Sequence, residues 1–263
     1  MNIAIIGGGN LGSAIAEGLI KERFTKPENI FITKRNTDTL KSLKEKGVHI
    51  SDNNNKAVKE SEMIILAVKP FQAKEVLEGI AKDLLPAKHI LVSVVTGLLL
   101  KDIKEIIKKD VPMFRAMPNT AIAIGESMTC ISSTSASKNH IESVNDLFEQ
   151  LGQVTLIDEK LMDAATILGA CGTAYAMRYI RASIQGGIEI GFDVRTASLI
   201  AAQTVKGAAE LLLKNGSHPE HEIDKVTTPK GCTIAGLNEM EHQGFSSSLI
   251  KGIMTSYLKI AKD

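Results

Sequence analysis

Short apolar segments alternate with helix-like patterns through the first part of the chain. Apolar recurrence every four residues, as at Leu11, Ile15 and Leu19, predicts a helix. Further helices are expected at 38–46, 73–84, 99–106 and 137–151. Apolar runs between them predict strands at 2–6, 29–33, 63–68, 89–95, 113–116, 128–131 and 153–157. This alternation predicts an α/β fold, with a doubly wound parallel sheet joined by right-handed crossovers.

The pattern changes after residue 157, where strand-like segments stop. Two long helical stretches follow, about 159–190 and 196–213, and then shorter ones, with Asp158 as the expected N-cap of the first. We therefore expect two domains. The α/β domain covers residues 1–157, and an all-α domain covers 158–263.

The predicted C-terminal helices are rich in small residues, such as Gly186-Gly187, Ala201-Ala202 and Gly207-Ala208-Ala209. Glycine inside a helix costs about 1 kcal/mol relative to alanine. That cost is tolerable where small side chains let helices approach closely. Because apolar faces without cover indicate an interface, we expect an interlocked homodimer; tight packing within one chain is the alternative.

Composition excludes several classes of protein. The 263 residues carry a net charge of +1, and aromatic residues are 4% with no Trp, which argues against a nucleic-acid binder. Cys130, Cys171 and Cys232 form no disulfide pattern, and His218 and His221 lack further ligands at metal-site spacing. No apolar run approaches the roughly 20 residues of a membrane span, and no signal-peptide pattern precedes the first strand. We expect a cytoplasmic protein without a metal.

A glycine-rich motif, Gly7-Gly8-Gly9-Asn10-Leu11-Gly12, links the first strand to the first helix. It fits G-x-G-x-x-G in the context that dinucleotide binding requires. Gly7 permits the tight turn, Gly9 the approach of the pyrophosphate, and Gly12 close packing of helix on strand. The amides at the helix start, around Asn10 and Leu11, then hold the phosphates, which predicts a Rossmann-type domain.

The end of the second strand predicts the coenzyme. NAD sites place Asp or Glu about 20 residues after the glycines, but this region reads Thr33-Lys34-Arg35-Asn36. Lys34 and Arg35 suit a 2′-phosphate, so we expect NADPH, with NADH binding more weakly. The alternative is that both cations are solvated loop residues.

Two later segments carry candidate substrate chemistry. Residues 115–120, Arg-Ala-Met-Pro-Asn-Thr, follow a strand and are expected at the carboxyl edge of the sheet. Residues 228–234 form a turn before a helix, which begins either at Thr228 with Pro229 in its first turn or near Gly231. In both cases the first amides of that helix suit a carboxylate.

Taken together, these segments resemble the pyrroline-5-carboxylate reductase family, the last enzymes of proline synthesis. The matching pieces follow the family order along nearly the whole chain, and the last is the most specific. They are GGGNLG (Gly7–Gly12), AVKP (Ala67–Pro70), RAMPNT (Arg115–Thr120), GTAY (Gly172–Tyr175) and TPKGCTIAGLNEMEHQG (Thr228–Gly244).

The resemblance implies reduction of 1-pyrroline-5-carboxylate to L-proline with NAD(P)H, a Rossmann domain and a helical dimerisation domain. It also implies dimers that often assemble further into decamers. It implies that the Thr233 hydroxyl reaches the ring nitrogen and that the carboxylate loop comes from the partner subunit. The implied substrate residues are Thr228, Gly231, Cys232 and Thr233. The further implied coenzyme residues are Asn55, Ala67, Val68, Lys69, Met117 and Asn119.

Three positions depart from the family pattern. The family usually has SPGG where this chain has Thr228–Gly231, GSGPAY where it has Ala170–Tyr175, and MPNTP where Ala121 follows Thr120. A β-hydroxyacid or imine dehydrogenase is a weaker alternative, because Gly169–Arg181 lacks the lysine typical of that class. A non-catalytic NADP-binding regulatory protein is a second alternative.

Overall fold

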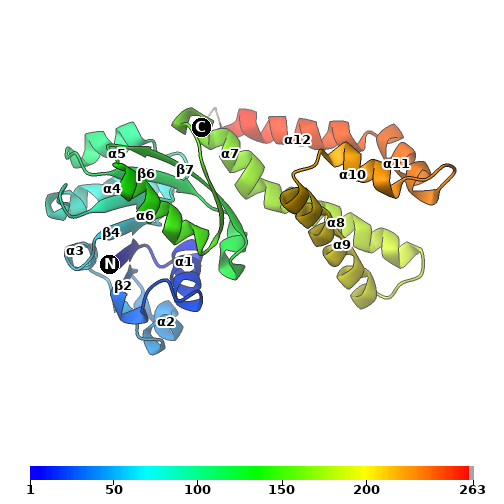
Figure 1. The fold of residues 1–263 in the computed structure, drawn as a ribbon. Coiled ribbons are helices and arrows are strands. Elements are labelled where there is room, and N and C mark those ends of the chain that lie inside the picture. Colours follow the sequence, from blue (N-terminus) through cyan, green and yellow to red (C-terminus); the bar gives the residue numbers. More distant parts are fainter. Residues whose placement is uncertain (261–263) are drawn as a thin grey trace. The chain divides into compact units, whose positions relative to one another are not determined.

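The computed structural model describes residues 1–260. The chain divides into two compact units, Met1–Cys171 and Gly172–Asp263. The first unit contains an eight-stranded sheet in the order β3-β2-β1-β4-β5-β6-β7-β8 (Figure 1). Its strands are β1 (Ile3–Ile6), β2 (Ile30–Thr33), β3 (His49–Ser51), β4 (Met63–Leu66), β5 (Ile90–Ser93), β6 (Met113–Met117), β7 (Ser127–Thr134) and β8 (Gly152–Leu156).

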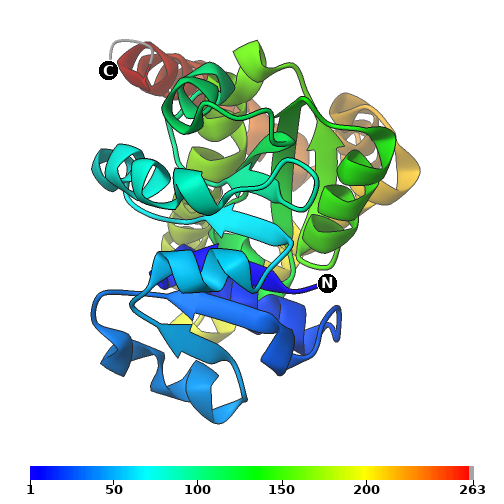
Figure 2. The same ribbon diagram turned by 90° about the vertical axis from the view of Figure 1, so that its left-hand side faces the viewer.

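Helices cover both faces of this sheet (Figure 2). One apolar cluster joins the sheet to α1 (Asn10–Lys21), α2 (Lys41–Glu45) and α6 (Lys138–Glu149). The other joins it to α3 (Asn54–Lys59), α4 (Pro70–Ile80) and α5 (Leu100–Ile107). Short 3-10 helices complete the unit at η1 (Pro27–Asn29), η2 (Thr37–Leu40), η3 (Ala81–Asp83), η4 (Thr120–Ile124) and η5 (Glu159–Leu161). The doubly wound α/β prediction is confirmed.

Two features of the sheet differ from the prediction. β3 was not predicted, because its three residues carry one aliphatic side chain, Ile50. β7 runs antiparallel to β6, whereas a parallel sheet was expected. The connection between them contains only η4, which is too short for the crossover that a parallel pair requires.

The predicted helix 159–190 is broken into several pieces. Asp158 is an N-cap, as predicted, but of η5, where its carboxylate accepts from Lys160 N at 3.0 Å. α7 (Met162–Ala165) follows, then a π-helix (Thr166–Cys171), and then α8 (Gly172–Glu189). The first compact unit includes residues 158–171 because Met162, Thr166 and Ile167 are buried in it. The division by role at 157/158 stays a prediction.

The second unit is all-helical within the described residues. α8 and α9 (Val194–Asn215) pack against each other, and a Cβ on Gly187 would lie 3.1 Å from Ala197 Cβ. α10 (Pro219–Val226), α11 (Cys232–His242) and α12 (Phe245–Ile260) follow. Tyr175 donates a hydrogen bond to Ser256, or accepts one from it, at 2.8 Å, which ties α8 to α12. The second predicted domain extends to residue 263, so its last three residues lie outside the described part.

Between residues 1 and 260, no helix is both long and apolar enough to cross a membrane.

Candidate functional site

The glycine turn after β1 is held tightly against its neighbours. Gly7 has φ +115°, and an added Cβ would lie 2.4 Å from the Ala67 carbonyl oxygen. A Cβ on Gly12 would lie 2.1 Å from the Gly7 carbonyl oxygen. The amides of Gly7 and Gly8 both donate to the Thr33 carbonyl, at 3.1 and 2.7 Å. Only glycine fits at positions 7 and 12, which is the geometry of a dinucleotide turn.

Gly9 stands in contrast, because a Cβ there would meet nothing within 4 Å. Gly9 is the N-cap of α1, without a side-chain cap and without an acid in the first turn. The first amides of α1, at Asn10 and Leu11, have no acceptor within the helix and lie at its positive end. This arrangement fits a pyrophosphate group.

The end of β2 carries the residues predicted to select the coenzyme. Thr33 is buried, and its hydroxyl donates to Asn54 Oδ1 at 2.6 Å, so its side chain is committed to the protein. Lys34 donates its amide to the Ser51 carbonyl at 3.0 Å. Arg35 is exposed, and its Nη2 lies 3.9 Å from Glu75 Oε2 on α4. The Thr33 hydroxyl and carbonyl are thus both engaged within the protein, and its contact with a coenzyme stays a prediction. Arg35 has an exposed side chain with one weak acidic partner.

Asn55 was expected in the coenzyme groove, but its amide nitrogen donates elsewhere. It contacts the Gly79 carbonyl at 2.8 Å and Asp83 Oδ2 at 2.6 Å, at the C-terminal end of α4. The Asn55 contact and the Lys59 ammonium hold the pKa of Asp83 below its usual value. The asparagine beside the β2 end is Asn54, through its contact with Thr33. The coenzyme role expected of Asn55 stays a prediction.

The end of β4 borders the glycine turn. Ala67 donates its amide to the Ile6 carbonyl at 2.8 Å, and Val68 Cγ1 would lie 3.0 Å from a Cβ on Gly7. Lys69 is exposed and is the N-cap of α4, with Pro70 in the first turn. The structure thus places Ala67 and Val68 against the glycine turn and leaves the Lys69 side chain exposed, and the coenzyme contacts expected of all three stay predictions.

The segment after β6 is ordered by Asn119. Its Oδ1 accepts from the Ala121 amide at 3.0 Å, and its Nδ2 donates to the Gly169 carbonyl in the π-helix at 3.2 Å. Its own amide donates to Ser127 Oγ at 3.1 Å. Met117 is buried in the core at 7% exposure. Asn119 therefore fixes this loop, and a direct contact of Met117 or Asn119 with a nicotinamide stays a prediction.

Arg115 is the largest fully buried side chain of the chain's described part. Its Nη1 lies 3.1 Å from Glu159 Oε1, which also accepts from the Leu100 amide at 2.7 Å. The pair ties η5 to the start of α5 and the end of β6. Because a buried charge without its partner is costly, this link is structural.

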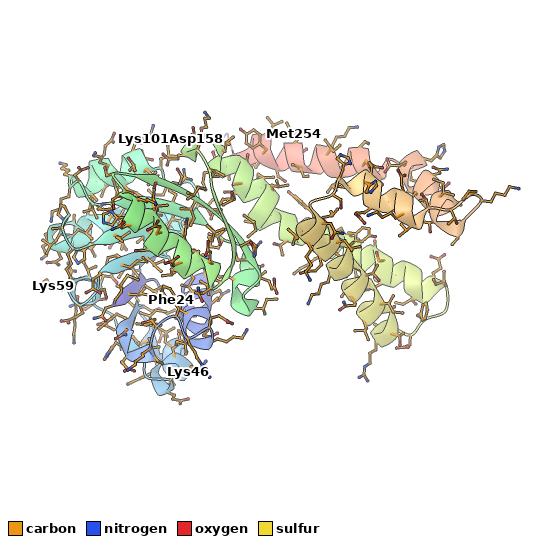
Figure 3. The ribbon with its side chains drawn as sticks, viewed as in Figure 1. Phe24, Lys46, Lys59, Lys101, Asp158 and Met254 are labelled. Carbon is orange, nitrogen blue, oxygen red and sulfur yellow. The ribbon has the colours of Figure 1, made fainter. Side chains whose placement is uncertain are left out.

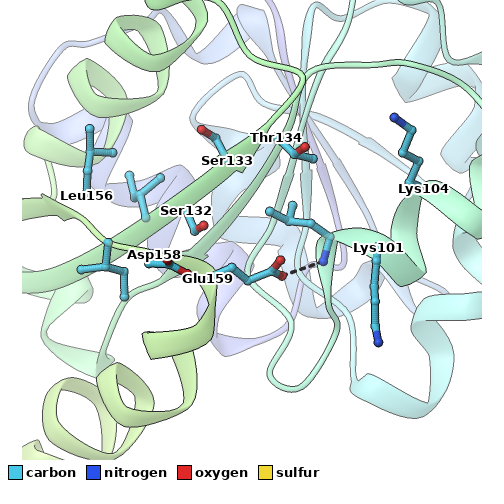
Figure 4. Close-up of a pocket in the computed structure, with 11 residues that line it drawn as sticks. Lys101, Lys104, Ser132, Ser133, Thr134, Leu156, Asp158 and Glu159 are labelled. Carbon is cyan, nitrogen blue, oxygen red and sulfur yellow. Dashed lines mark hydrogen bonds between the residues drawn. The ribbon is translucent and has the colours of Figure 1, made fainter.

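A cavity of about 540 Å³ lies beside this link, and Figure 4 shows the Glu159 contact at its edge. Lys101, Lys104, the β7 residues Ser132–Thr134, and Asp158 contribute to its lining (Figure 4). None of the residues predicted to bind coenzyme or substrate lines it. The cavity is therefore separate from the glycine turn.

In the second unit, residues 228–231 form a turn in which the Gly231 amide donates to the Thr228 carbonyl at 2.9 Å. Of the two starts considered, the helix begins at the later one: Gly231 is the N-cap of α11, and Thr228 is not. A Cβ on Gly231 would lie 2.5 Å from Thr228 Oγ1. No side chain caps α11 and no acid stands in its first turn, so the amides of Cys232 and Thr233 are available to an anion.

The fold and the glycine turn define a class of protein: a Rossmann-type oxidoreductase that uses a nicotinamide dinucleotide. Family models agree with this class. Residues 2–97 match the family described as NADP oxidoreductase, coenzyme F420-dependent, and residues 159–262 match pyrroline-5-carboxylate reductase dimerisation.

Individual relatives show to which family the chain belongs. Pyrroline-5-carboxylate reductase 2 of Dictyostelium discoideum is 45% identical over 99% of this chain and 92% of its own length. Pyrroline-5-carboxylate reductase 1 of the same organism is 48% identical over 98% of this chain, which spans about half (49%) of that relative's length. The Plasmodium falciparum pyrroline carboxylate reductase solved with NADP bound has a TM-score of 0.89 and 26% identity, covering 99% of this chain and 97% of its own.

The chain belongs to the pyrroline-5-carboxylate reductase family. The resemblance, the fold class and the classification as an NAD(P)H-dependent reductase are confirmed. The match to a dimerisation family also supports a homo-oligomer. The roles of individual site residues stay predictions.

Proposed function

We propose that this chain reduces 1-pyrroline-5-carboxylate to L-proline with NADPH in proline synthesis. The observation that carries the proposal is the cradle at Gly7 and Gly12, where a Cβ would occupy the turn. Family membership then supplies the substrate. An anionic cyclic imine also suits the uncapped start of α11.

The residues of the first unit fit the coenzyme. The amides of Gly9, Asn10 and Leu11 suit its pyrophosphate, and Lys34 and Arg35 suit the 2′-phosphate. When bound, the coenzyme supplies the hydride. The chain's own task is to bind, to orient and to exclude water.

The start of α11 would hold the substrate. The amides of Cys232 and Thr233 would donate to its carboxylate, while Gly231 and Thr228 shape the turn through the bond from the Gly231 amide to the Thr228 carbonyl. The Thr233 hydroxyl would orient the ring nitrogen. A protonated cyclic imine is already electrophilic, so positioning is the main requirement and no strong general acid is needed. As in the family pattern, we assign this loop to the partner subunit's site.

The test follows NADPH absorbance with pyrroline-5-carboxylate, with a 3-hydroxy acid in the oxidative direction as the control. Turnover of the imine alone supports the proposal. Turnover of the hydroxy acid supports a β-hydroxyacid dehydrogenase, and NADPH binding without turnover of either supports a regulatory protein. Thr233→Val should lower kcat about tenfold or more while Thr233→Ser keeps most activity, since only the hydroxyl orients the ring.

We also propose a cytoplasmic homodimer that can assemble further, up to a decamer. Large exposed apolar side chains on α8, α9 and α12 support association. Light scattering of the purified chain tests the number of subunits.

A further inference from the structure

An acidic side chain lies beside the cations at the β2 end, although the sequence there has none. Glu75 comes from α4, and its Oε2 lies 3.9 Å from Arg35 Nη2. Sites for NAD place an acid at the end of β2, where it accepts from the 2′-hydroxyl of the ribose. Here α4 supplies an acid next to the Arg35 guanidinium, at the same end of the sheet.

The packing of α4 explains the position of Glu75. Ala73, Leu77 and Ile80 are buried against the sheet, which turns Glu75 outward. α4 begins directly after β4, and β4 and β2 flank β1 as parallel strands. The start of α4 and the end of β2 therefore lie at the same carboxyl edge, on either side of the glycine turn.

The contact between Arg35 and Glu75 is easily exchanged. Their side chains are 80% and 79% exposed, and the distance of 3.9 Å is long for an ion pair. Exposed pairs of this kind contribute little stability. A dianionic phosphate would compete successfully for the guanidinium, because Arg binds phosphate through two parallel hydrogen bonds.

We propose that Glu75 sets the balance between NADPH and NADH; this proposal rests on the proposed function. With NADPH, the 2′-phosphate takes Arg35 from Glu75, and the nearby carboxylate opposes the phosphate charge. With NADH, Glu75 remains available to accept from the 2′-hydroxyl. Glu75 thus reduces the preference for NADPH that Lys34 and Arg35 create.

The test measures the dissociation constants of NADPH and NADH directly, by fluorescence titration without substrate. Glu75→Gln should tighten NADPH and weaken NADH, raising the ratio of the NADH to the NADPH constant about fivefold, an upper value for an exposed pair. Glu78→Gln is the matched control, because Glu78 is exposed on the same helix, farther from the β2 end. Arg35→Gln should lower the ratio and remove most of the effect of Glu75→Gln on NADPH.

The outcomes separate the two proposals. If wild type binds both coenzymes and turns over the imine, but Glu75→Gln gives the same ratio as Glu78→Gln, only the role of Glu75 is overturned. A wild-type chain that binds neither coenzyme overturns both proposals. A raised ratio in Glu75→Gln in a chain without imine turnover supports the role of Glu75 and contradicts the proposed substrate.

Discussion

Single glycines in the turn after β1 have two separable tasks. Gly12→Ala would place a Cβ 2.1 Å from the Gly7 carbonyl oxygen, so we expect a loss of about 1–3 kcal/mol of stability together with coenzyme affinity. Gly9→Ala meets nothing within 4 Å and should cost less than about 1 kcal/mol, as a weaker N-cap. Its NADPH affinity should still fall about tenfold, because the methyl group stands where the pyrophosphate approaches.

Thermal unfolding and NADPH titration of both variants check this division. A Gly9→Ala chain that binds NADPH as tightly as wild type contradicts the placement of the pyrophosphate. A Gly12→Ala chain with unchanged stability contradicts the close contact with Gly7.

His89 makes stability depend on pH. It is 1% exposed, and burial and the neighbouring Lys88 lower its pKa. Its Nδ1 accepts from the Leu85 amide at 2.9 Å. The unfolded chain binds a proton near the ordinary pKa of about 6.5, whereas the folded chain binds it only at lower pH. Stability from this group is therefore present above about pH 6.5 and is lost as pH falls toward the lowered value.

We expect a smaller free energy of unfolding at pH 5.5 than at pH 7.5, measured by urea denaturation. His89→Asn, which can keep an acceptor for the Leu85 amide, should reduce this difference. His221→Asn, at an exposed position, is the matched control and should retain it. An equal pH dependence in all three proteins would count against His89.

At the scale of elements, the turn before α11 has Lys230 at a position where the family usually has glycine. Lys230 has φ +59° and stands third in the turn 228–231, where a type II turn favours glycine. A left-handed conformation costs a non-glycine residue roughly 1–2 kcal/mol. Glycine avoids this cost, but it loses more backbone entropy on folding, which offsets part of the gain in stability. Lys230→Gly should therefore stabilise the chain by up to about 1 kcal/mol. Lys230→Ala removes the same charge but keeps a Cβ in the left-handed conformation. Denaturation curves should therefore show that Lys230→Gly is the more stable of the two variants.

Most elements of the first unit were predictable because their signals are local. The apolar runs of β1, β2, β4 and β5 and the glycine motif need only neighbouring residues. β3 lacked an apolar run, and the direction of β7 depends on a short connection. The π-helix Thr166–Cys171 has no hydrophobic pattern that distinguishes it from an α-helix, so the sequence predicts one continuous helix through it.

The candidate site was predictable where a motif defines it and not where distant side chains meet. The partner of Arg35 is 40 positions away in Glu75, and that of Arg115 is Glu159. Neither pair has a spacing that a helix or strand pattern reveals. Asn55 was chosen by resemblance, whereas the contact with Thr33 comes from Asn54.

At the scale of the whole molecule, the second unit lacks a core of its own within the described residues. No residue of α8, α10, α11 or α12 is buried, and in α9 only Ala197 and Ala201 are. Large apolar side chains stay exposed instead, such as Leu199 at 69% and Met254 on α12 (Figure 3). A Cβ on Gly186 or Gly207 would meet nothing within 4 Å, which leaves room for another helix. Together with the match to a dimerisation family, these surfaces support association with a second copy of the chain.

Leu199→Glu tests whether the exposed apolar surface of α9 mediates this association. Burying one leucine contributes about 1.5–3 kcal/mol, and a twofold interface counts it twice, so the dimer should weaken at least about a hundredfold. Light scattering across a dilution series should show monomer at concentrations where wild type is associated. Leu85→Glu, at an exposed leucine of the first unit, is the control and should leave association unchanged.

Because the carboxylate loop is assigned to the partner subunit, imine turnover of Leu199→Glu should fall on dilution in parallel with the dimer while NADPH binding persists. A monomer with full turnover would show instead that one chain completes the site alone.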